Sequence, residues 1–233
     1  MKHIKQIIFD ADDTLWENNI YYIEASEAFF TLLSDYGFER QEVENAFDNL
    51  EANVVKEKGY GSHNFVFILD ELYKQFNLRS NRPIDRKQYQ SIVSRFTRHP
   101  KRKPRLFQGV ENTLSKLNNN YILYILTKGD HEEQEGKIIR SGLHKLVNDY
   151  FVVEEKNDYT YENLIQQHRW NPDETCMVGN SPKSDINPAL RNGMYAIHIP
   201  YENTWKLDDE PLLDRNGRLH RISKFTDLLD FFL

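Results

Sequence analysis

Two aspartates, Asp10 and Asp12, lie two residues apart directly after the apolar run of residues 7–9, and Asp13 follows them. This pattern predicts a buried strand that delivers carboxylates to the rim of a sheet. Residues two apart on an extended chain point to the same side, so both side chains can converge on one small site. There one carboxylate can attack an electrophile while the other transfers protons, and together they offer the hard oxygen ligands that suit Mg²⁺. The alternative is an acidic turn in which Asp13 or Thr14 is the N-cap of the next helix.

Hydroxyl and cationic groups follow two more apolar runs. Thr127 offers a hydroxyl, and the backbone N–H of Lys128 comes after it, so this pair can bind a phosphate oxygen. Threonine at such a position is also a common helix cap. Lys156 offers a cation that can neutralise an aspartate nucleophile and hold a transferring anionic group. A lone lysine that follows two glutamates is more often part of a solvated surface.

A further apolar run ends in Gly179, and two oxygen-bearing side chains come after it, those of Asn180 and Asp185. With Asp10 and the backbone carbonyl of Asp12, these side chains could complete a site for a hard divalent cation. An acid pair, a hydroxyl, a lysine and a last acid thus occur at four successive predicted strand ends. Ligands bind outside the carboxyl ends of the strands in open α/β sheets, so we expect these groups to meet at one edge of the sheet.

The elements that must position these residues alternate between strand and helix from about residue 105 onward. Apolar runs predict strands over residues 121–126, 150–153, 175–178 and 195–199, in addition to the first strand at 7–9. Helical spacing is found over residues 109–117 and 161–169 and in a closing segment at 225–232. Repeated strand–helix units are typical of a parallel sheet with helices on both faces. The predicted fold is therefore α/β, with a doubly wound (Rossmann-like) parallel sheet as its core.

A helical module interrupts this core after the first strand. Apolar residues at helical spacing predict a helix that ends at Gly37, and further helices are predicted over residues 40–55, 64–76 and 86–96. The predicted domains are a core of residues 1–16 and 105–233 and a cap of residues 17–104. Two segments could contact a substrate or could simply be solvated connections, namely the loop at 58–63 and the basic stretch at 95–105.

Composition excludes several classes of protein. Acidic residues outnumber basic ones 36 to 30, and the net charge of −6 disfavours general binding of nucleic acid. The single cysteine, Cys176, lies in an apolar run and is expected to be a buried structural thiol. No apolar run approaches the roughly 18 residues that a membrane helix needs, and no signal segment precedes the first strand. We expect a cytoplasmic protein without a membrane partner, and the sequence does not distinguish a monomer from a homodimer.

The order of these motifs resembles that of the haloacid dehalogenase-like (HAD) hydrolases over nearly the whole chain. The resemblance implies that Asp10 is a nucleophile that becomes an aspartyl-phosphate and that Asp12 is the general acid and base. It implies that Thr127, Lys128 and Lys156 bind the phosphoryl group, and that Mg²⁺ is held by Asp10, Asp12, Asn180 and Asp185. The inserted helices resemble the C1 type of cap in this family, which closes over the substrate.

Two features refine this resemblance. The fourth motif of the family commonly begins Gly-Asp, whereas this chain has Gly179-Asn180, so one metal ligand carries no charge. The dehalogenases of the family lack the second aspartate of the first motif, so Asp12 favours phosphate ester hydrolysis. The resulting hypothesis is a Mg²⁺-dependent phosphomonoesterase acting on a small phosphorylated metabolite. The alternatives are a phosphotransferase or mutase of the same superfamily and, because of Asn180, a binding protein that retains the fold without turnover.

Overall fold

The computed structural model describes residues 1, 3–213 and 217–233. The chain divides into two compact units, a core unit of residues 1–19 and 103–233 and an inserted unit of residues 20–102. The boundaries proposed from the sequence lay at residues 16 and 104. The inserted unit leaves the core unit after the first strand and returns before the second, which is why the core is discontinuous in sequence.

The core unit contains a six-stranded parallel sheet with the strand order β3-β2-β1-β4-β5-β6. Its strands are β1 (Gln6–Phe9), β2 (Ile122–Lys128), β3 (Asp149–Val153), β4 (Thr175–Gly179), β5 (Tyr195–His198) and β6 (Leu219–Arg221). The chain first builds outward from β1 to β3 and then returns to build from β4 to β6 on the other side of β1. The reversal places a topological switch point between β1 and β4, where open α/β sheets bind their ligands. The predicted α/β fold with a parallel sheet and a helical insertion is confirmed.

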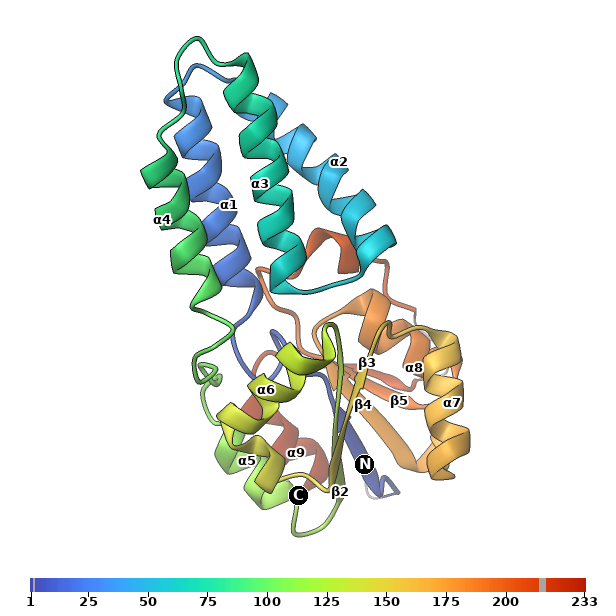
Figure 1. Ribbon diagram of the computed structural model, residues 1–233. Coiled ribbons are helices and arrows are strands. Elements are labelled where there is room, and N and C mark those ends of the chain that lie inside the picture. Colours follow the sequence, from blue (N-terminus) through green and yellow to red (C-terminus); the bar gives the residue numbers. More distant parts are fainter. Residues whose placement is uncertain (2, 214–216) are drawn as a thin grey trace. The chain divides into compact units, whose positions relative to one another are not determined.

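Helices cover both faces of this sheet, and β1 is buried from both sides (Figure 1). Ile7 and Phe9 pack in the same apolar cluster as helices α5 (Val110–Leu117), α6 (His131–Ser141) and α9 (Leu228–Phe232). Ile8 points to the opposite face, where it packs with α7 (Asp158–His168) and α8 (Asn187–Arg191). Burial of both faces explains why the central strands read as continuous apolar runs rather than as alternating patterns. Cys176 of β4 is fully buried in the same apolar cluster as Ile7 and Phe9, as expected.

The segment after β4 departs from a regular helix. Residues Pro182–Ile186 form a π turn, in which the N–H of Asn187 donates to the carbonyl of Pro182 five residues earlier, before α8 begins. Pro188 has no N–H, and its ring would crowd the carbonyl of Ser184 in a regular α-helix. The buried hydroxyl of Tyr161 donates to that carbonyl instead, at 3.0 Å. A π turn of this kind often marks a functional site, and this one carries Asp185.

Several short elements were not expected from the sequence. The edge strand β6 has only three residues, and its sequence Leu-His-Arg forms no apolar run. Short 3-10 turns occupy Leu143–Lys145, Pro172–Glu174, Lys206–Asp208 and Phe225–Asp227, the last of which leads into α9. These elements depend on neighbours that are distant in sequence, since β6 exists only because it pairs with β5.

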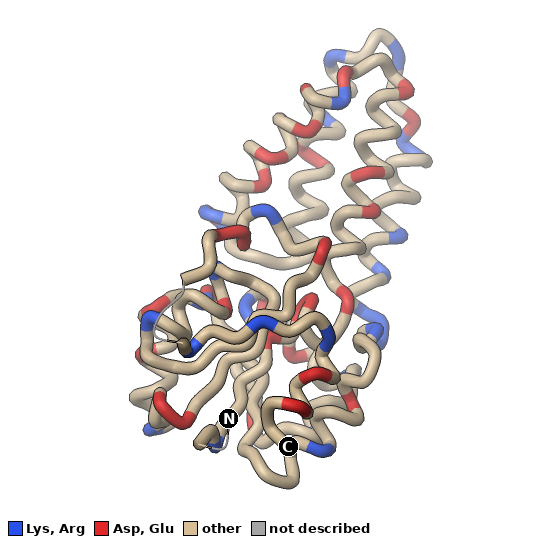
Figure 2. The backbone as a smooth tube through the Cα atoms, turned by 180° about the vertical axis from the view of Figure 1, so that it is seen from behind, with Lys and Arg blue, Asp and Glu red and all other residues tan. Residues whose placement is uncertain are grey.

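The inserted unit is a bundle of four helices, α1 (Asn19–Ser34), α2 (Arg40–Lys58), α3 (Ser62–Arg79) and α4 (Arg86–Thr97), of which α1 begins at the last residue of the first core segment. It has an apolar core of its own, rich in aromatic residues such as Phe29, Phe47, Phe65, Phe76 and Tyr89. Asn64 holds the turn between α2 and α3 by donating to the carbonyls of Lys58 and Gly59. Acidic and basic residues are interspersed along the helices (Figure 2), and Arg95 in the basic stretch pairs with Glu24. None of the helices in the described residues is long and apolar enough to cross a membrane.

Candidate active site

Asp10 lies at the end of β1, directly at the switch point. Its backbone N–H donates to the carbonyl of Val178 at 2.9 Å, which extends the pairing of β1 with β4 by one residue. Its side chain is only 6% exposed. The ammonium nitrogen of Lys156 lies 2.5 Å from Asp10 Oδ1 and also donates to Asp185 Oδ1. Three of the residues predicted from separate strand ends are therefore in direct contact.

Burial and neighbouring charges shift the pKa values of Asp10 and Lys156. Burial, and then the nearby charge of Asp185, raise the pKa of Asp10 to about 7, although Lys156 acts in the opposite direction. Burial alone would lower the pKa of Lys156, but the charges of Asp10 and Asp185 hold that pKa well above its usual range. One cation thus faces two buried carboxylates. The second oxygen of Asp10, Oδ2, is buried and has no hydrogen-bond partner.

Asp185 reaches this position through the loop after β4. The N–H of Ser181 donates to Asp185 Oδ2 at 2.9 Å, and the π turn folds the chain back over Gly179. A Cβ atom at position 179 would collide with the Asp185 carboxylate, so only glycine permits this close approach. The side-chain oxygen of Asn180 accepts from the Thr14 hydroxyl at 3.2 Å, and the backbone carbonyl of Asn180 accepts from His198 Nε2 at 3.0 Å.

The oxygen atoms of this group could serve as ligands of a hard divalent cation. Within residues 1, 3–213 and 217–233, no three His, Cys, Asp or Glu side chains are grouped closely enough to hold a metal ion. A cation here would need the amide oxygen of Asn180 and a backbone carbonyl in addition to the Asp10 and Asp185 carboxylates. Oxygen ligands of this mixed kind are those that Mg²⁺ and Ca²⁺ accept. The unpartnered Oδ2 of Asp10 is an acceptor that a cation would satisfy, so the residues present fit such an ion.

The Asp12 side chain is turned away from this group and toward helix α6. Lys137 Nζ lies 2.8 and 2.7 Å from its two oxygens, Gln134 Nε2 lies 2.8 Å from Oδ2, and Trp16 Nε1 lies 2.6 Å from Oδ1. Burial would raise the pKa of Asp12, but the charge of Lys137 and these hydrogen bonds together lower it below its usual value. The carboxylate is therefore occupied by protein donors, and only the backbone carbonyl of Asp12 is left to act as the predicted metal ligand.

Sequence reasoning missed Lys137, Gln134 and Trp16. Gln134 and Lys137 lie three residues apart and so share one face of α6, but both are also ordinary residues for a solvated helix. Their burial, with exposed fractions of 5% and 2%, depends on how α6 packs against the sheet. The sequence carries no signal that would have singled them out.

Asp13 is not the N-cap that the alternative interpretation expects, because it lies six residues before Asn19, the first residue of α1, but its carboxylate does contact the start of that helix. Its carboxylate accepts from the backbone N–H groups of Asn18 and Asn19, at 2.9 and 3.1 Å, where α1 begins. Its backbone lies in the left-handed region, with φ of 66°. Burial, with a smaller contribution from the charge of Asp12, raises the pKa of Asp13 to about 8. The acidic motif therefore also satisfies two backbone N–H groups at the start of α1.

The two residues predicted to bind phosphate from β2 have different surroundings. Thr127 is buried at the penultimate position of β2, in register with Val152 of β3. The Lys128 ammonium donates to Ser184 Oγ at 2.8 Å and to Asp208 Oδ1 at 2.6 Å. The side chain of Lys128 thus takes part in an ion pair beside Asp185, and a role in binding substrate stays a prediction.

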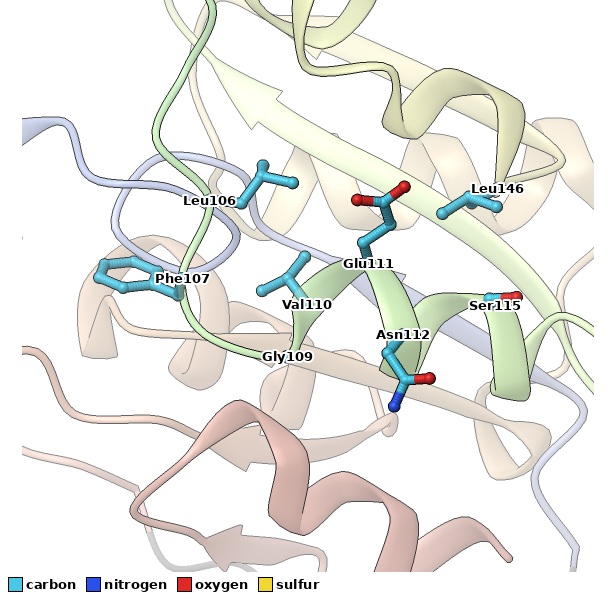
Figure 3. Close-up of a pocket in the computed structure, with 8 residues that line it drawn as sticks. All are labelled: Leu106, Phe107, Gly109, Val110, Glu111, Asn112, Ser115 and Leu146. Atoms are coloured by element: carbon cyan, nitrogen blue, oxygen red, sulfur yellow. The ribbon is translucent and has the colours of Figure 1, made fainter.

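A separate surface pocket of about 530 Å³ lies elsewhere on the core unit (Figure 3). It is lined by the start of α5, the turn before it and one residue after α6, which are Leu106, Phe107, Gly109, Val110, Glu111, Asn112, Ser115 and Leu146. None of these is a predicted site residue, and the only ionisable group among them is Glu111. The pocket therefore has no residue in common with the predicted site at the strand ends.

The model of the haloacid dehalogenase-like hydrolases matches residues 4–193, a span that includes Asp10, Lys156 and Asp185. The chain belongs to this family. The helical insertion after β1 fits the C1 type of cap, so the family resemblance inferred from the motifs is confirmed.

Named relatives include phosphatases. The chain is 27% identical over 216 residues to the glyceraldehyde 3-phosphate phosphatase of Pyrococcus furiosus, covering 90% of this chain and 86% of that one. A haloacid dehalogenase-like family hydrolase from Xanthomonas campestris has 28% identity and a TM-score of 0.79, covering 97% of this chain and 89% of that one. The putative HAD-hydrolase YfnB from Bacillus subtilis, solved bound to magnesium, shares the fold with a TM-score of 0.62 at 18% identity, and 99% of each chain is covered. This HAD-like hydrolase thus has phosphatases among its relatives.

Proposed function

We propose that this HAD-like hydrolase is a Mg²⁺-dependent phosphomonoesterase that acts on a small phosphorylated metabolite through an aspartyl-phosphate on Asp10. The observation that carries the proposal is the pair formed by Asp10 and Lys156. Asp10 presents one oxygen, Oδ2, without a hydrogen-bond partner, while its other oxygen is held by the Lys156 ammonium. A carboxylate fixed at one oxygen and open at the other suits nucleophilic attack.

A cation beside Asp10 would reduce the electrostatic repulsion that opposes this attack. Carboxylate and phosphate are both anionic, so they repel each other unless positive charge lies between them. The Lys156 ammonium supplies one positive charge, but it is shared with Asp185. Asp10, Asn180, Asp185 and the backbone carbonyl of Asp12 would hold Mg²⁺. When bound, the ion would neutralise charge on the phosphoryl oxygens and align them for displacement.

The chain's own residues account for both half-reactions. In the first, an Asp10 oxygen bonds to phosphorus, the bond from phosphorus to the ester oxygen breaks, and Asp12 gives that oxygen a proton. In the second, Asp12 takes a proton from water as the water oxygen bonds to phosphorus, and the bond between phosphorus and Asp10 breaks. Inorganic phosphate leaves and Asp10 is regenerated. Thr127 and Lys156 hold the phosphoryl oxygens throughout, which fixes the geometry of displacement.

The relatives support a substrate class. A phosphatase of glyceraldehyde 3-phosphate is similar to this chain over most of both sequences. We therefore propose a small phosphorylated metabolite of the triose phosphate kind, with glyceraldehyde 3-phosphate as the first candidate. At 27% identity, sugar phosphates and phosphorylated acids must be tested beside it.

The test is release of inorganic phosphate from a panel of phosphomonoesters, with and without Mg²⁺, by the native protein and by Asp10→Asn. We expect release that requires the metal and that falls below detection in the variant. Acid quenching of the native protein with a ³²P-labelled ester should trap label on the chain, and D10N should trap none. Absence of release from every ester by a folded native protein would refute hydrolysis and favour a binding protein. Transfer of the phosphoryl group to added glycerol, in place of release of inorganic phosphate, would favour a transferase.

A further inference from the structure

The Asp12 carboxylate accepts four hydrogen bonds from three side chains. Lys137 contributes two of them, Gln134 and Trp16 contribute one each from α6 and the first loop, and their distances lie between 2.6 and 2.8 Å. The Lys137 ammonium makes a further hydrogen bond to Asn18 Oδ1, at 3.1 Å. The carboxylate itself therefore has four bonds, two to each oxygen, which fix both its position and its plane.

Burial of the Lys137 ammonium is unfavourable unless charged or polar partners compensate for the lost hydration. It is one of two buried lysines in the described part of the chain, and the other is Lys156 on Asp10. Removing an ammonium from water costs several kcal/mol unless good partners compensate, and an apolar side chain of similar size at such a place is often at least as stable. The remaining carboxylate near Lys137 is that of Glu133, whose oxygen lies 3.9 Å from the ammonium. The close partner of Lys137 is therefore Asp12.

We propose that Lys137 is a positioning residue that holds the Asp12 carboxylate in place for its part in phosphate ester hydrolysis. This inference rests on the proposed function, because it assigns Asp12 to proton transfer. The Lys137 ammonium bonds to Asp12 and Asn18 and not to Asp10, so it acts through Asp12. Two aspartates two residues apart thus each have a buried lysine, one at the nucleophile and one at the acid and base.

The geometry indicates which half-reaction depends most on Lys137. An ammonium can only donate, so an Asp12 that accepts from Lys137 at both oxygens is a carboxylate. That is the form of Asp12 that must receive a proton from the attacking water in the second half-reaction. Without Lys137, the carboxylate would retain Gln134 and Trp16, one at each oxygen, and would rotate more freely. Misplacement of a catalytic group by about 1 Å can cost roughly 100-fold in rate.

The first experiment compares native protein with Lys137→Met, which keeps the length of the side chain and suits a buried site. We expect kcat for the best ester of the panel to fall by about 10- to 100-fold with little change in KM. Trapped aspartyl-phosphate at steady state should increase, because hydrolysis of the intermediate is slowed more than its formation. Lys145→Met, at an exposed lysine just beyond α6, is the matched control and should leave both constants unchanged. Unchanged kcat in a folded K137M would overturn the proposal.

A double-mutant cycle separates positioning from a structural role. In an Asp12→Asn background, K137M should lower the residual kcat no further, because the group that Lys137 positions is already disabled. An equal loss in both backgrounds would show that Lys137 acts on the fold and not through Asp12, and would overturn the proposal.

A second readout does not require turnover. Trp16 donates from its indole N–H to Asp12 Oδ1, so the indole ¹H–¹⁵N resonance of Trp16 reports on this carboxylate. We expect K137M to shift that resonance and K145M to leave it in place. If the native protein releases no phosphate from any ester, the proposed function fails. If K137M leaves the Trp16 resonance unchanged, it is the positioning of Asp12 by Lys137 that fails.

Discussion

Thr14 donates its hydroxyl hydrogen to the side-chain oxygen of Asn180 at 3.2 Å, and this bond joins the turn after β1 to the loop after β4. The two residues are 166 positions apart in sequence. The amide nitrogen of Asn180 faces the other way, toward the Thr204 hydroxyl at 3.4 Å. Asn180 is therefore held so that its oxygen lies on the side of β1, where Asp10 lies, although the family commonly has an aspartate at this place.

Asn180→Asp restores the charge that the motif commonly carries. An added carboxylate strengthens binding of a hard cation, so we expect the Mg²⁺ concentration for half-maximal phosphate release to fall by about tenfold. The Thr14 hydroxyl can still donate to the new carboxylate, while the weak bond to Thr204 is lost, so the change in stability should stay within about 1 kcal/mol. The measurement is a Mg²⁺ titration of phosphate release with a thermal melt as control. An unchanged Mg²⁺ requirement would show that residue 180 is not a ligand.

Gly179→Ala tests how closely Asp185 must approach the end of β4. The new methyl group would collide with the Asp185 carboxylate, which must then move off Lys156. We expect kcat to fall by about 100-fold or more. Gly136→Ala on α6 is the matched control, because the atoms nearest its methyl group are the far end of the Arg140 side chain and the helix should gain about 0.5–1 kcal/mol. Equal activity of G179A and G136A would contradict the assigned role of Asp185.

The acids, Thr127 and Lys156 could be proposed as candidate site residues because each follows an apolar run that a buried strand requires. Such runs are local properties of the sequence, and parallel strands bring their carboxyl ends together whatever the connecting helices contain. The contact of Lys156 with Asp10 and Asp185 follows from that geometry. The inserted helices could be predicted for the same reason, because their apolar spacing is local.

The rest of the site could not be predicted because it depends on packing. Lys137 contacts Asp12 only because α6 lies with one face toward the end of β1. Lys128 follows Thr127 as a phosphate-binding residue would, yet its ammonium pairs with Asp208, which is 80 positions away in a segment without a clear pattern. The strand β6 and the π turn before α8 likewise arise from partners distant in sequence, His198 and Tyr161 among them.

Lys156→Met removes the cation shared by two buried carboxylates. We expect the free energy of unfolding, measured by urea without divalent metal ions, to fall by about 3–5 kcal/mol. Phosphate release should be lost, because nothing then offsets the repulsion between Asp10 and the phosphoryl group. Lys5→Met is the control, since its pair with Glu174 is largely exposed and should contribute no more than about 1 kcal/mol. Similar losses of stability in the two variants would contradict the view that burial makes the Lys156 pair important.

Asp208→Asn tests what Lys128 does beside the site. The Asp208 carboxylate neutralises the Lys128 ammonium at 2.6 Å, which leaves little attraction there for a second anionic group on a substrate. In D208N that attraction should increase, although Glu155 remains 3.8 Å away. We expect kcat/KM for phosphoglycolate to rise severalfold relative to that for glyceraldehyde 3-phosphate. A ratio that does not change would place Lys128 out of reach of the substrate.

The raised pKa of Asp13 predicts how the stability of the protein varies with pH. Burial raises the pKa of Asp13 to about 8 in the folded state, whereas an unfolded aspartate titrates near 4. Between these values the folded protein binds a proton that the unfolded chain does not, so stability is greatest below about pH 4 for this group and falls as pH rises toward 8. The loss for one group is at most about 1.4 kcal/mol per pH unit.

Asp13→Asn should reduce this loss. Asparagine tolerates the left-handed backbone of residue 13 and can still accept from the N–H groups of Asn18 and Asn19. Urea unfolding at pH 5, 6, 7 and 8 should therefore show a smaller fall in the free energy of unfolding for D13N than for the native protein. Asp10 contributes a fall of the same sign in both proteins, so the difference between the two curves isolates Asp13. Parallel curves would show that Asp13 is ionised in the folded state at all four pH values.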